Sequence, residues 1–451
     1  MSSYWCQWAW LGGDTATADV LLQTSGGLIV GVLPGVACPA DAVRLTGVTL
    51  PGLANAHSHA FHRVLRGRTQ VGVGSFWTWR EQMYLAAARL DPDSYHRLAR
   101  AVYGEMAMAG ITCVGEFHYL HHGPGGTPYD ELNAMGEALA AAAADAGIRL
   151  TLLDACYLHG GISADRRHVP PNEVQQRFSD GDALSWATRA TSSLALESPM
   201  CRVGAAVHSV RAVDPASMQV VATWAEAHDA PVHAHVSEQQ VENERCVDAY
   251  GLTPVALLAE RGVLSPRFTA VHATHLSGID IELLGTAHCT ICMCPTTERD
   301  LADGIGPAMA LRDMGARLSL GSDSHAVIDL FEEARALELD ERLGSLVRGS
   351  HDAPSLLRAA TVDGHASLGW PDAGAISVGS LADLVTVRLD SVRTAGATDA
   401  SMLETMVFAA SAADVHHVVV DGRVVVSDGA HRSIDVAHEL HEAILDVMSD
   451  R

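Results

Sequence analysis

The sequence predicts an α/β protein: a (β/α)8 TIM-like barrel with a small β-sandwich domain built from both chain termini. Two observations lead to this fold class. Through the middle of the chain, eight short apolar runs alternate with helix-like segments, and further β-type runs lie near both ends. Near-continuous apolar strands separated by helices are typical of a parallel sheet, and eight such repeats indicate a closed barrel. An open, doubly wound sheet is the structural alternative.

The eight apolar runs are the predicted barrel strands. The first ends at His57, and the others span 112–117, 150–155, 203–207, 231–236, 268–273, 289–294 and 318–321. Helix-like segments, such as 95–109, 131–146 and 217–227, lie between most of them. No Gly-x-Gly-x-x-Gly motif follows any of these runs, so nothing points to a dinucleotide site or a P-loop.

The domain boundaries follow from the same pattern. Residues 1–50 and 378–430 form the predicted β-sandwich domain, 51–377 form the metal-dependent barrel, and 431–451 form a C-terminal helix. Two unrelated edge hairpins are the alternative for the terminal runs. We favour one shared domain, because the two ends of a chain often lie close together.

Composition and charge narrow the class of function. The chain has 451 residues, of which 48% are hydrophobic, enough for a large core. Its formal net charge of −24 repels nucleic acid and anionic lipid. No apolar run is long enough to span a membrane. Nine cysteines without a secretory signal indicate reduced thiols and a cytoplasmic protein. We expect no nucleic-acid and no membrane partner.

His57-x-His59 is the first candidate metal motif. In an extended strand, side chains alternate with period two, so both imidazoles point to one side, where they suit zinc and neighbouring divalent metals. Two solvated loop histidines are the alternative, since the chain has 24 histidines. The chain contains no lysine. A lysine carbamate therefore cannot bridge two metals, and one ion is the simpler expectation.

Polar residues close six of the eight predicted strands. These strand ends are His57–His59, Glu116–Tyr119, His208–Arg211, His233–Glu238, His272–His275 and Ser322–His325. In a barrel of this type the carboxyl ends of all strands meet at one face, where such enzymes carry their chemistry. The pattern therefore predicts a metal-dependent active site at that face.

These residues also carry a resemblance. His57-x-His59, His235 with Glu238 three residues later, His272 and Asp323 together resemble the amidohydrolase superfamily, in its mononuclear deaminase branch. Four stretches resemble the formimidoylglutamate deiminase family more narrowly: Phe76–Tyr84, Glu116–Tyr119, His208–Arg211 and Cys294–Arg299. That family hydrolyses N-formimino-L-glutamate to N-formyl-L-glutamate and ammonia in histidine degradation. The resemblance runs from about Pro51 to about Val426, and His62 stands where we expect a glutamine in that family.

The resemblance implies a set of catalytic roles. One divalent metal ion per chain, with Zn²⁺ as the first expectation, is held by His57, His59, His235 and Asp323. Hydroxide generated at the metal attacks the formimino carbon. Asp323 accepts the proton of the water, Glu238 protonates the departing nitrogen, and His272 stabilises the developing charge. Glu238 as an ordinary helix-start carboxylate and His272 as a buried structural histidine are the alternatives.

The resemblance also implies how the substrate binds. Its two carboxylates need planar, permanently charged partners, which arginine provides. The implied substrate-binding residues are Arg80, Tyr119, His208 and Arg211. A surface position is the alternative for Arg80, and a core position is the alternative for Tyr119. The expected partner is thus a small anionic molecule, and a homodimer is expected from the family.

Two other functions stay open. One is a different deaminase of the same branch, acting on a heterocycle such as guanine or cytosine, which requires a pocket that stacks a flat ring. The other is an inactive scaffold that kept the fold. Loss of metal ligands would mark the scaffold, and no ligand of the set is missing here.

Overall fold

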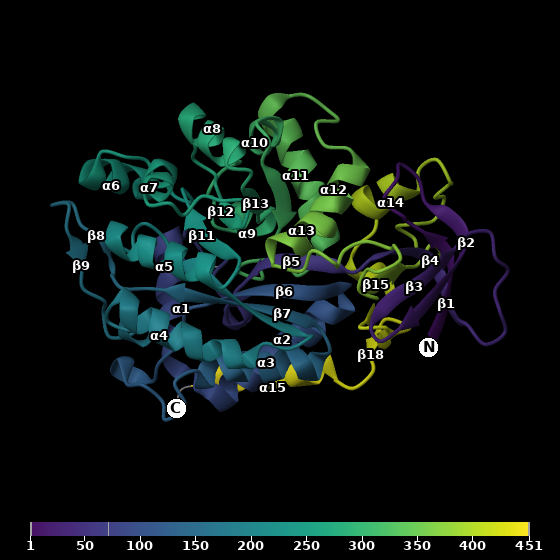
Figure 1. Ribbon diagram of the computed structural model, residues 1–451, viewed down its shortest axis with the longest axis horizontal. Helices are drawn as coiled ribbons and strands as arrows, with labels where there is room; N and C mark the ends of the chain where they lie inside the picture. The colour runs from purple at the N-terminus through teal and green to yellow at the C-terminus, as the bar shows by residue number, and fades with distance from the viewer. Residues whose placement is uncertain (1, 71, 450–451) are drawn as a thin grey trace.

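The computed structural model describes residues 2–70 and 72–449 and shows an eight-stranded parallel barrel with a second sheet beside it (Figure 1). The barrel strands are β5 Leu53–Ser58, β6 Ile111–His118, β7 Arg149–Cys156, β10 Cys201–Val207, β11 Val232–Val236, β12 Phe268–His272, β13 Thr290–Met293 and β14 Arg317–Leu320, and they are neighbours in this order. The predicted (β/α)8 fold is confirmed. Residues 1, 71 and 450–451, on which the outer limits of the predicted first domain and last helix fall, lie outside the described residues.

The barrel closes between its last and first strands. Just past β14, the backbone N–H of Asp323 donates to the His57 carbonyl at 3.0 Å, and the His59 N–H donates to the Asp323 carbonyl at 3.3 Å. Gly321 permits this approach, because a Cβ there would lie 2.8 Å from the His57 Cβ. The contact brings the carboxyl ends of β5 and β14 together.

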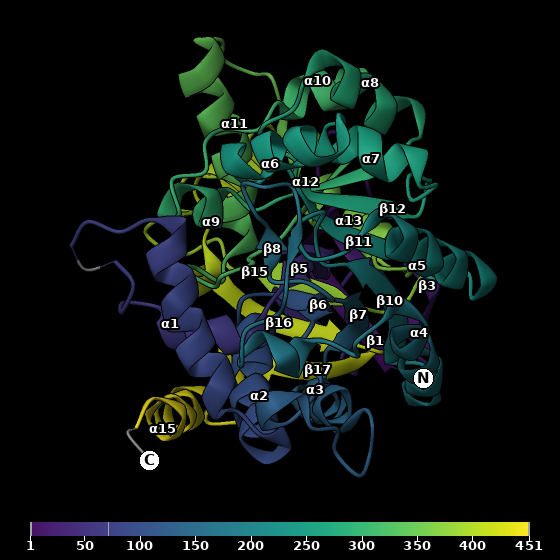
Figure 2. The same cartoon turned by 90° about the vertical axis from the view of Figure 1, so that its left-hand side faces the viewer.

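The strands are apolar on both faces, as their sequences predicted. Every residue of β6, β7 and β11 is buried, because helices cover the barrel outside and side chains fill it inside. Figure 2 shows these helices around the strands. They are α1 Phe76–Arg89, α2 Pro92–Met108, α3 Ala134–Ala146, α4 Ala183–Ser193, α5 Pro215–Ala227, α6 Gln240–Tyr250, α7 Pro254–Glu260, α8 Gly278–Thr286, α9 Pro295–Asp300, α10 Ala308–Asp313, α11 Leu330–Ser345, α12 Ala353–Ala360 and α13 Val362–Ser367.

Both ends of the chain build the second sheet, which confirms the predicted terminal domain. Its strands are β1 Ser2–Ala9, β2 Thr17–Ser25, β3 Leu28–Leu33 and β4 Val43–Pro51 from one end, and β15 Leu384–Val387, β16 Val415–Val420, β17 Arg423–Ser427 and β18 Ala430–His431 from the other. The two halves join where β4 and β15 pair antiparallel, with Leu50 opposite Val385. The edge strand β3 also bridges Leu28 to Leu381, so the sheet bends back on itself around a second apolar core.

A buried ion pair connects the barrel to this domain. Arg149, the first residue of β7, donates from Nε to Asp383 Oδ2 at 2.6 Å, and Asp383 lies just before β15. Both side chains are almost fully buried. Two further helices pack on the barrel helices: α14 Met402–Phe408 on α11 and α12, and α15 Val436–Met448 along α2.

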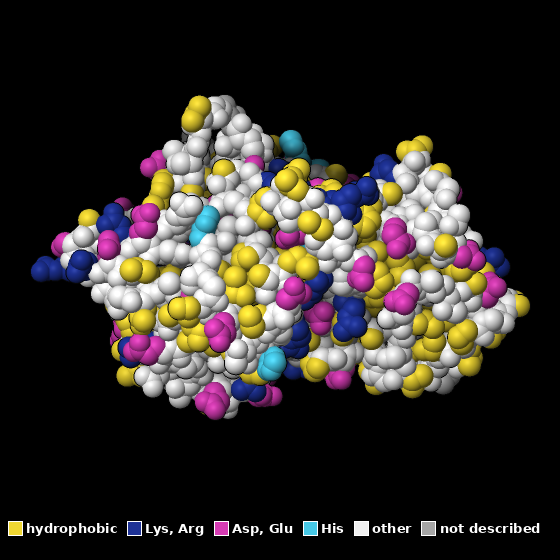
Figure 3. All heavy atoms as spheres, turned by 90° about the horizontal axis from the view of Figure 1, so that it is seen from above, with side chains coloured by type: hydrophobic (Ala, Val, Ile, Leu, Met, Phe, Trp, Pro, Cys, Tyr) yellow, Lys and Arg dark blue, Asp and Glu magenta, His cyan; other side chains and the backbone are white. Residues whose placement is uncertain are grey.

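The outer surface carries scattered charges. On the face seen in Figure 3, acidic and basic side chains are interspersed among uncharged ones. Among residues 2–70 and 72–449, no helix has the length and apolar character needed to cross a bilayer.

Candidate active site

Four predicted metal ligands converge at the carboxyl ends of β5, β11 and β14. The ligand atoms of His57, His59, His235 and Asp323 all lie within 4.8 Å of one another, and all four side chains are buried. His235 Nε2 is 3.2 Å from His57 Nε2 and 3.4 Å from His59 Nε2. Asp323 Oδ1 is 3.3 Å from His57 Nε2 and 3.5 Å from His59 Nε2.

These spacings fit a bound divalent ion. Ligand atoms at about 2.0–2.1 Å from a tetrahedral zinc lie about 3.3 Å from one another, close to the spacing seen here. Three imidazole nitrogens and one carboxylate oxygen are also a donor set that zinc accepts. The cluster can therefore hold one ion without rearrangement of its side chains.

Backbone carbonyls fix the tautomers of two of the imidazoles. His59 Nδ1 lies 3.0 Å from the Phe117 carbonyl, and His235 Nδ1 lies 2.8 Å from the His208 carbonyl. A carbonyl only accepts, so each Nδ1 carries the proton and each Nε2 presents a lone pair to the cluster. Burial lowers the pKa of His57, His59 and His235, which keeps all three rings neutral and able to bind a metal.

The backbone around the cluster is strained. Ser237, His272 and Asp323 have φ values of 53°, 68° and 41°, in the left-handed region that residues other than glycine rarely adopt. These residues follow or end β11, β12 and β14. Strain of this kind persists only where the surrounding structure enforces it, and it is concentrated at functional sites. Two of these three residues, His272 and Asp323, are themselves side chains of the site.

Of the three predicted catalytic side chains, Asp323 belongs to this cluster, and His272 and Glu238 lie next to it. His272 Nε2 is 3.8 Å from Asp323 Oδ2 and 3.9 Å from Glu238 Oε1. Burial raises the pKa of Glu238, an effect that the charges of His272 and Arg211 partly offset. Burial disfavours a charged His272, but the charge of Glu238 and the other nearby carboxylates outweigh it and raise the pKa of His272 well above its usual range. The site thus places a buried carboxyl group beside an imidazole whose protonation the ionised form of this carboxyl group favours.

Sequence reasoning missed Glu298, which holds His272 from behind. Glu298 Oε1 lies 3.4 Å from His272 Nδ1 and accepts the backbone N–H of Cys294 at 2.9 Å. Glu298 is buried on α9, which begins directly after β13. The signal available in the sequence was the position of Glu298: a carboxylate shortly after an apolar run, within the Cys294–Arg299 stretch.

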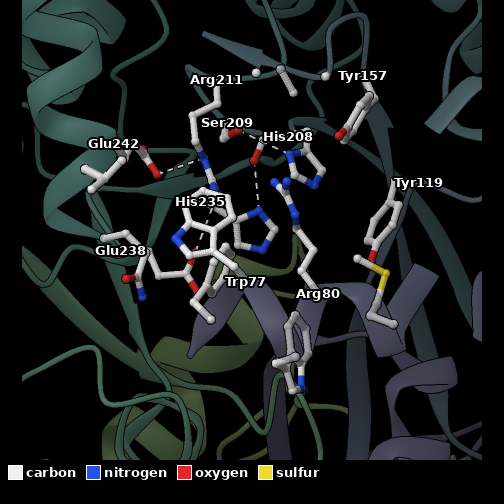
Figure 4. A pocket seen from close by; sticks show the side chains of 18 of the residues that line it. Trp77, Arg80, Tyr119, Tyr157, His208, Ser209, Arg211, His235, Glu238 and Glu242 are labelled. Atoms are coloured by element: carbon white, nitrogen blue, oxygen red, sulfur yellow. Dashed lines mark hydrogen bonds and ion pairs between the residues drawn. The ribbon is translucent and has the colours of Figure 1, made fainter. Parts of the chain in front are cut away.

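A cavity of about 310 Å³ opens from this cluster and contains all four predicted substrate-binding residues. Arg80 comes from α1, Tyr119 follows β6, and His208 and Arg211 follow β10. Figure 4 shows these side chains arranged around the hollow with His235 and Glu238. Aromatic side chains form much of the remaining wall: Phe76, Trp77, Trp79, Tyr84, Tyr157 and Phe178.

The two predicted arginines differ in their surroundings. Arg211 Nε lies 3.2 Å from Glu242 Oε2, and its Nη2 lies 3.6 Å from Glu238 Oε2. The Arg80 guanidinium instead stacks over Trp77 and Tyr84, at 4.6 and 5.5 Å from their ring centroids. Arg211 is therefore neutralised within the protein, whereas Arg80 lies over aromatic faces.

His62 takes part in the cavity through Tyr119. Its Nε2 lies 2.9 Å from the Tyr119 hydroxyl, and its ring centroid lies 4.5 Å from that of the metal-ligand candidate His59. Burial lowers the pKa of His62 to about 3, so the ring is neutral at physiological pH. His62 thus fixes the Tyr119 hydroxyl at the cavity wall.

Comparison with known proteins gives a consistent picture. The model of the amidohydrolase family matches residues 48–425. A formimidoylglutamate deiminase from Pseudomonas aeruginosa is 37% identical over 401 residues, which covers 86% of this chain and 87% of the relative. An amidohydrolase structure from Brucella melitensis has a TM-score of 0.91 at 32% identity and covers 100% of both chains. An adenosine deaminase structure from Xanthomonas campestris with bound zinc has a TM-score of 0.84 at 25% identity and covers 98% of this chain and 97% of its own.

Proposed function

The chain belongs to the amidohydrolase family, and from this premise we propose that it hydrolyses N-formimino-L-glutamate to N-formyl-L-glutamate and ammonia. One observation carries the proposal: a single cavity joins a His/Asp cluster suited to a metal with arginines suited to carboxylates. The likeness to the Pseudomonas aeruginosa formimidoylglutamate deiminase supports this choice of substrate.

The tail of the substrate is bound by the cavity wall. Arginine offers a planar fork of N–H donors that matches a carboxylate, so the arginines of the cavity wall meet the carboxylates. Tyr119 adds a hydroxyl. Burial and the neighbouring arginines lower the pKa of His208, so its neutral ring contributes a hydrogen bond rather than a charge. The formimino head then reaches the His/Asp cluster.

The cluster activates water. One divalent ion per chain, Zn²⁺ in our proposal, would be held by His57, His59, His235 and Asp323; when bound, it acts as a Lewis acid that lowers the pKa of water to about 7. Asp323 keeps Oδ1 toward the histidines and leaves Oδ2 on the side of His272. Oδ2 is thus positioned to accept the proton that water loses during attack.

The remaining residues complete the hydrolysis. The water oxygen forms a bond to the formimino carbon, and the bond from this carbon to the terminal nitrogen then breaks. Glu238, whose pKa is raised by burial, gives its proton to that nitrogen, and Asp323 passes on the proton that it took from water, so that the nitrogen leaves as ammonia. The new hydroxyl becomes the formyl carbonyl and returns its proton to Glu238. His272 carries a proton that donates a hydrogen bond toward the developing negative charge.

Four further assignments belong to the same proposal. We propose that the reaction serves histidine degradation, that the enzyme acts in the cytoplasm, that it forms a homodimer, and that its partner is a small anionic substrate rather than nucleic acid or membrane. The strongly negative chain and the arginines of the cavity support the last point. Sedimentation of the purified protein tests the dimer.

Deamination of a heterocycle is the second candidate. The aromatic side chains of the cavity favour it, because they offer flat faces to a ring. The arginines of the same cavity oppose it, since an uncharged ring leaves them without anions.

Ammonia release from the zinc-loaded protein separates the two candidates. N-formimino-L-glutamate, guanine, cytosine and adenosine are offered in parallel, with metal content measured in the same samples. We expect turnover of the formimino compound alone. Turnover of a nucleobase without turnover of N-formimino-L-glutamate would overturn the proposal.

A further inference from the structure

One face of α6 turns toward the cavity and carries an arginine that sequence reasoning did not select. Val241, Glu242 and Arg245 all line the cavity. Arg245 lies four residues after Val241 and three residues after Glu242, and this spacing places all three side chains on one side of the helix. Arg245 is therefore directed to the cavity by the same helical periodicity that directs Glu242, the partner of Arg211.

Arg211 is already matched by carboxylates of the protein. Glu242 is fully buried, and among residues 2–70 and 72–449 its ion-pair partner is Arg211, whose Nε lies 3.2 Å from Glu242 Oε2. Glu238 approaches the same guanidinium at 3.6 Å. Removing Arg211 from these groups would leave a buried charge uncompensated, which proteins avoid. A substrate carboxylate can share this arginine but does not find an unopposed charge there.

Arg80 and Arg245 have no such carboxylates. Within residues 2–70 and 72–449, neither guanidinium forms an ion pair with an acidic side chain of the protein. Arg80 stacks on Trp77 and Tyr84, which leaves its N–H edges available. Both arginines are half-buried on the cavity wall, on two different helices, α1 and α6.

The charges of the cavity match a dianionic tail when Arg245 is included. Apart from Asp323 in the metal cluster, the lining residues carry three arginines and two carboxylates, Glu238 and Glu242. Arg211 faces both of these carboxylates, which leaves Arg80 and Arg245 as the two arginines of the wall without an acidic partner among the described residues, one for each substrate carboxylate. Without Arg245, one substrate carboxylate would enter a strongly negative protein without a cation of its own.

We propose that Arg245 binds one of the two substrate carboxylates, so that Arg80 and Arg245 grip the dicarboxylate from α1 and α6 while Arg211 mainly organises Glu238 and Glu242. This inference rests on the proposed function and deepens it, since it defines the preferred ligand class as a dicarboxylate. It also makes α6 a determinant of substrate choice.

The test compares Arg245→Met with two matched variants of the full-length, zinc-loaded enzyme. Arg245→Lys keeps the charge, and Arg261→Met removes an equal charge outside the cavity, where Arg261 pairs with Glu260. Steady-state kinetics are measured with N-formimino-L-glutamate and with two truncated compounds, N-formimino-4-aminobutyrate and N-formimino-L-norvaline. Each truncated compound lacks a different carboxylate. Calorimetry with glutarate measures dicarboxylate binding without turnover.

We expect Arg245→Met to raise KM for the diacid by about tenfold or more, which equals about 1.4 kcal/mol, with a much smaller change in kcat. For the truncated compound that lacks the carboxylate bound by Arg245, the mutation should leave KM almost unchanged. Glutarate binding should weaken by a similar factor. Arg245→Lys should recover part of the loss, and Arg261→Met should match the unaltered enzyme.

The outcomes separate this inference from the proposed function. A diacid KM and a glutarate affinity that both stay within about twofold in Arg245→Met would overturn the inference, even if the diacid is a good substrate. If no formimino compound is turned over but glutarate binding still depends on Arg245, the proposed function fails and the dicarboxylate site stands. Equal losses in Arg245→Met and Arg261→Met would also overturn the inference, because the effect would then be one of net charge.

Discussion

Glu298 Oε1 lies 3.4 Å from His272 Nδ1, on the side of the imidazole that faces away from Asp323 and Glu238. The contact orients the ring, because Nδ1 is tied to a carboxylate that is itself held by the Cys294 N–H. His272 Nε2 is thereby directed toward the reacting groups. A residue five positions past β13 thus acts on the site through a histidine of β12.

Glu298→Gln should lower kcat by about 10–100-fold with metal content and KM little changed, which is the usual effect of losing a partner of this kind. The amide keeps the shape but loses the charge that favours a protonated His272. The pH dependence of kcat should therefore shift as well. Glu404→Gln, at an exposed position of α14, is the control and should leave the pH profile unchanged. An unchanged profile in Glu298→Gln would contradict the orienting role.

Replacing His59 or Asp323 by Ala should remove both metal and activity while the fold is retained. Each change deletes one donor from a four-residue cluster whose ligand atoms lie within 4.8 Å. Elemental analysis and circular dichroism of the purified variants check the prediction. Full metal content with near-normal turnover in either variant would show that the ligand set is wrong.

Glu238→Gln should keep the metal and lose about 10²–10⁴-fold in kcat, the usual contribution of a positioned acid–base group. Glu238 must be protonated to act as an acid, and burial raises its pKa. Activity of the unaltered enzyme should therefore fall as pH rises through that raised pKa. In Glu238→Gln, this fall in activity with rising pH should be absent. A kcat close to that of the unaltered enzyme would mean that another group protonates the nitrogen.

Glu116 predicts a pH dependence of stability. It is buried beneath Ser58 and Ala60, and burial raises its pKa from 4.5 to about 7, against the hydrogen bonds that lower it. The folded state holds this proton up to about pH 7, whereas the unfolded chain releases it near 4.5. The free energy of unfolding from this group should thus decrease as pH rises between these values and level off above them.

Thermal denaturation between pH 4.5 and 8 checks this dependence, with Glu116→Gln as the comparison. The glutamine does not titrate, so the variant should lose the component of the slope that Glu116 causes. Asp165, which is exposed, provides a control in Asp165→Asn. Identical slopes in the unaltered protein and in Glu116→Gln would rule out Glu116 as the source.

The metal cluster could be predicted because its signals are local. His57 and His59 share one side of a strand by period two, and polar residues stand at the ends of the other apolar runs. The selection of His235 and Asp323 among them came from the resemblance to the amidohydrolase family. The parallel barrel then brings such ends together whatever lies between them. The same reasoning predicted the eight barrel strands and the domain shared by both termini.

The pairing of side chains between different loops could not be predicted in this way. The Arg211–Glu242 ion pair joins the loop after β10 to α6, and the His62–Tyr119 hydrogen bond joins the turn after β5 to the end of β6. Neither depends on spacing within one element. Both depend on the relative position of two neighbouring segments, which only the folded barrel defines.

The Arg211–Glu242 contact changes what an arginine substitution should do. Arg211→Met should cut kcat/KM for N-formimino-L-glutamate by at least about 10²-fold with metal content unchanged, and it should also destabilise the fold. The second effect arises because Glu242 is fully buried and loses its cation. Breaking a buried pair from one side costs about 3–5 kcal/mol.

The double variant Arg211→Met/Glu242→Gln separates these two effects. The amide can still accept the Ser237 N–H that Glu242 Oε1 accepts at 3.2 Å, but it carries no charge to strand. Its melting temperature should therefore recover most of the loss, while kcat/KM stays low because Glu238 still lacks its arginine partner. Arg80→Met should lower kcat/KM without the loss in stability, since Arg80 stacks on aromatic rings and pairs with no carboxylate among the described residues. Equal melting temperatures for Arg211→Met and Arg80→Met would show that Glu242 does not depend on Arg211 for its charge, and the division of labour between the two arginines would then be wrong.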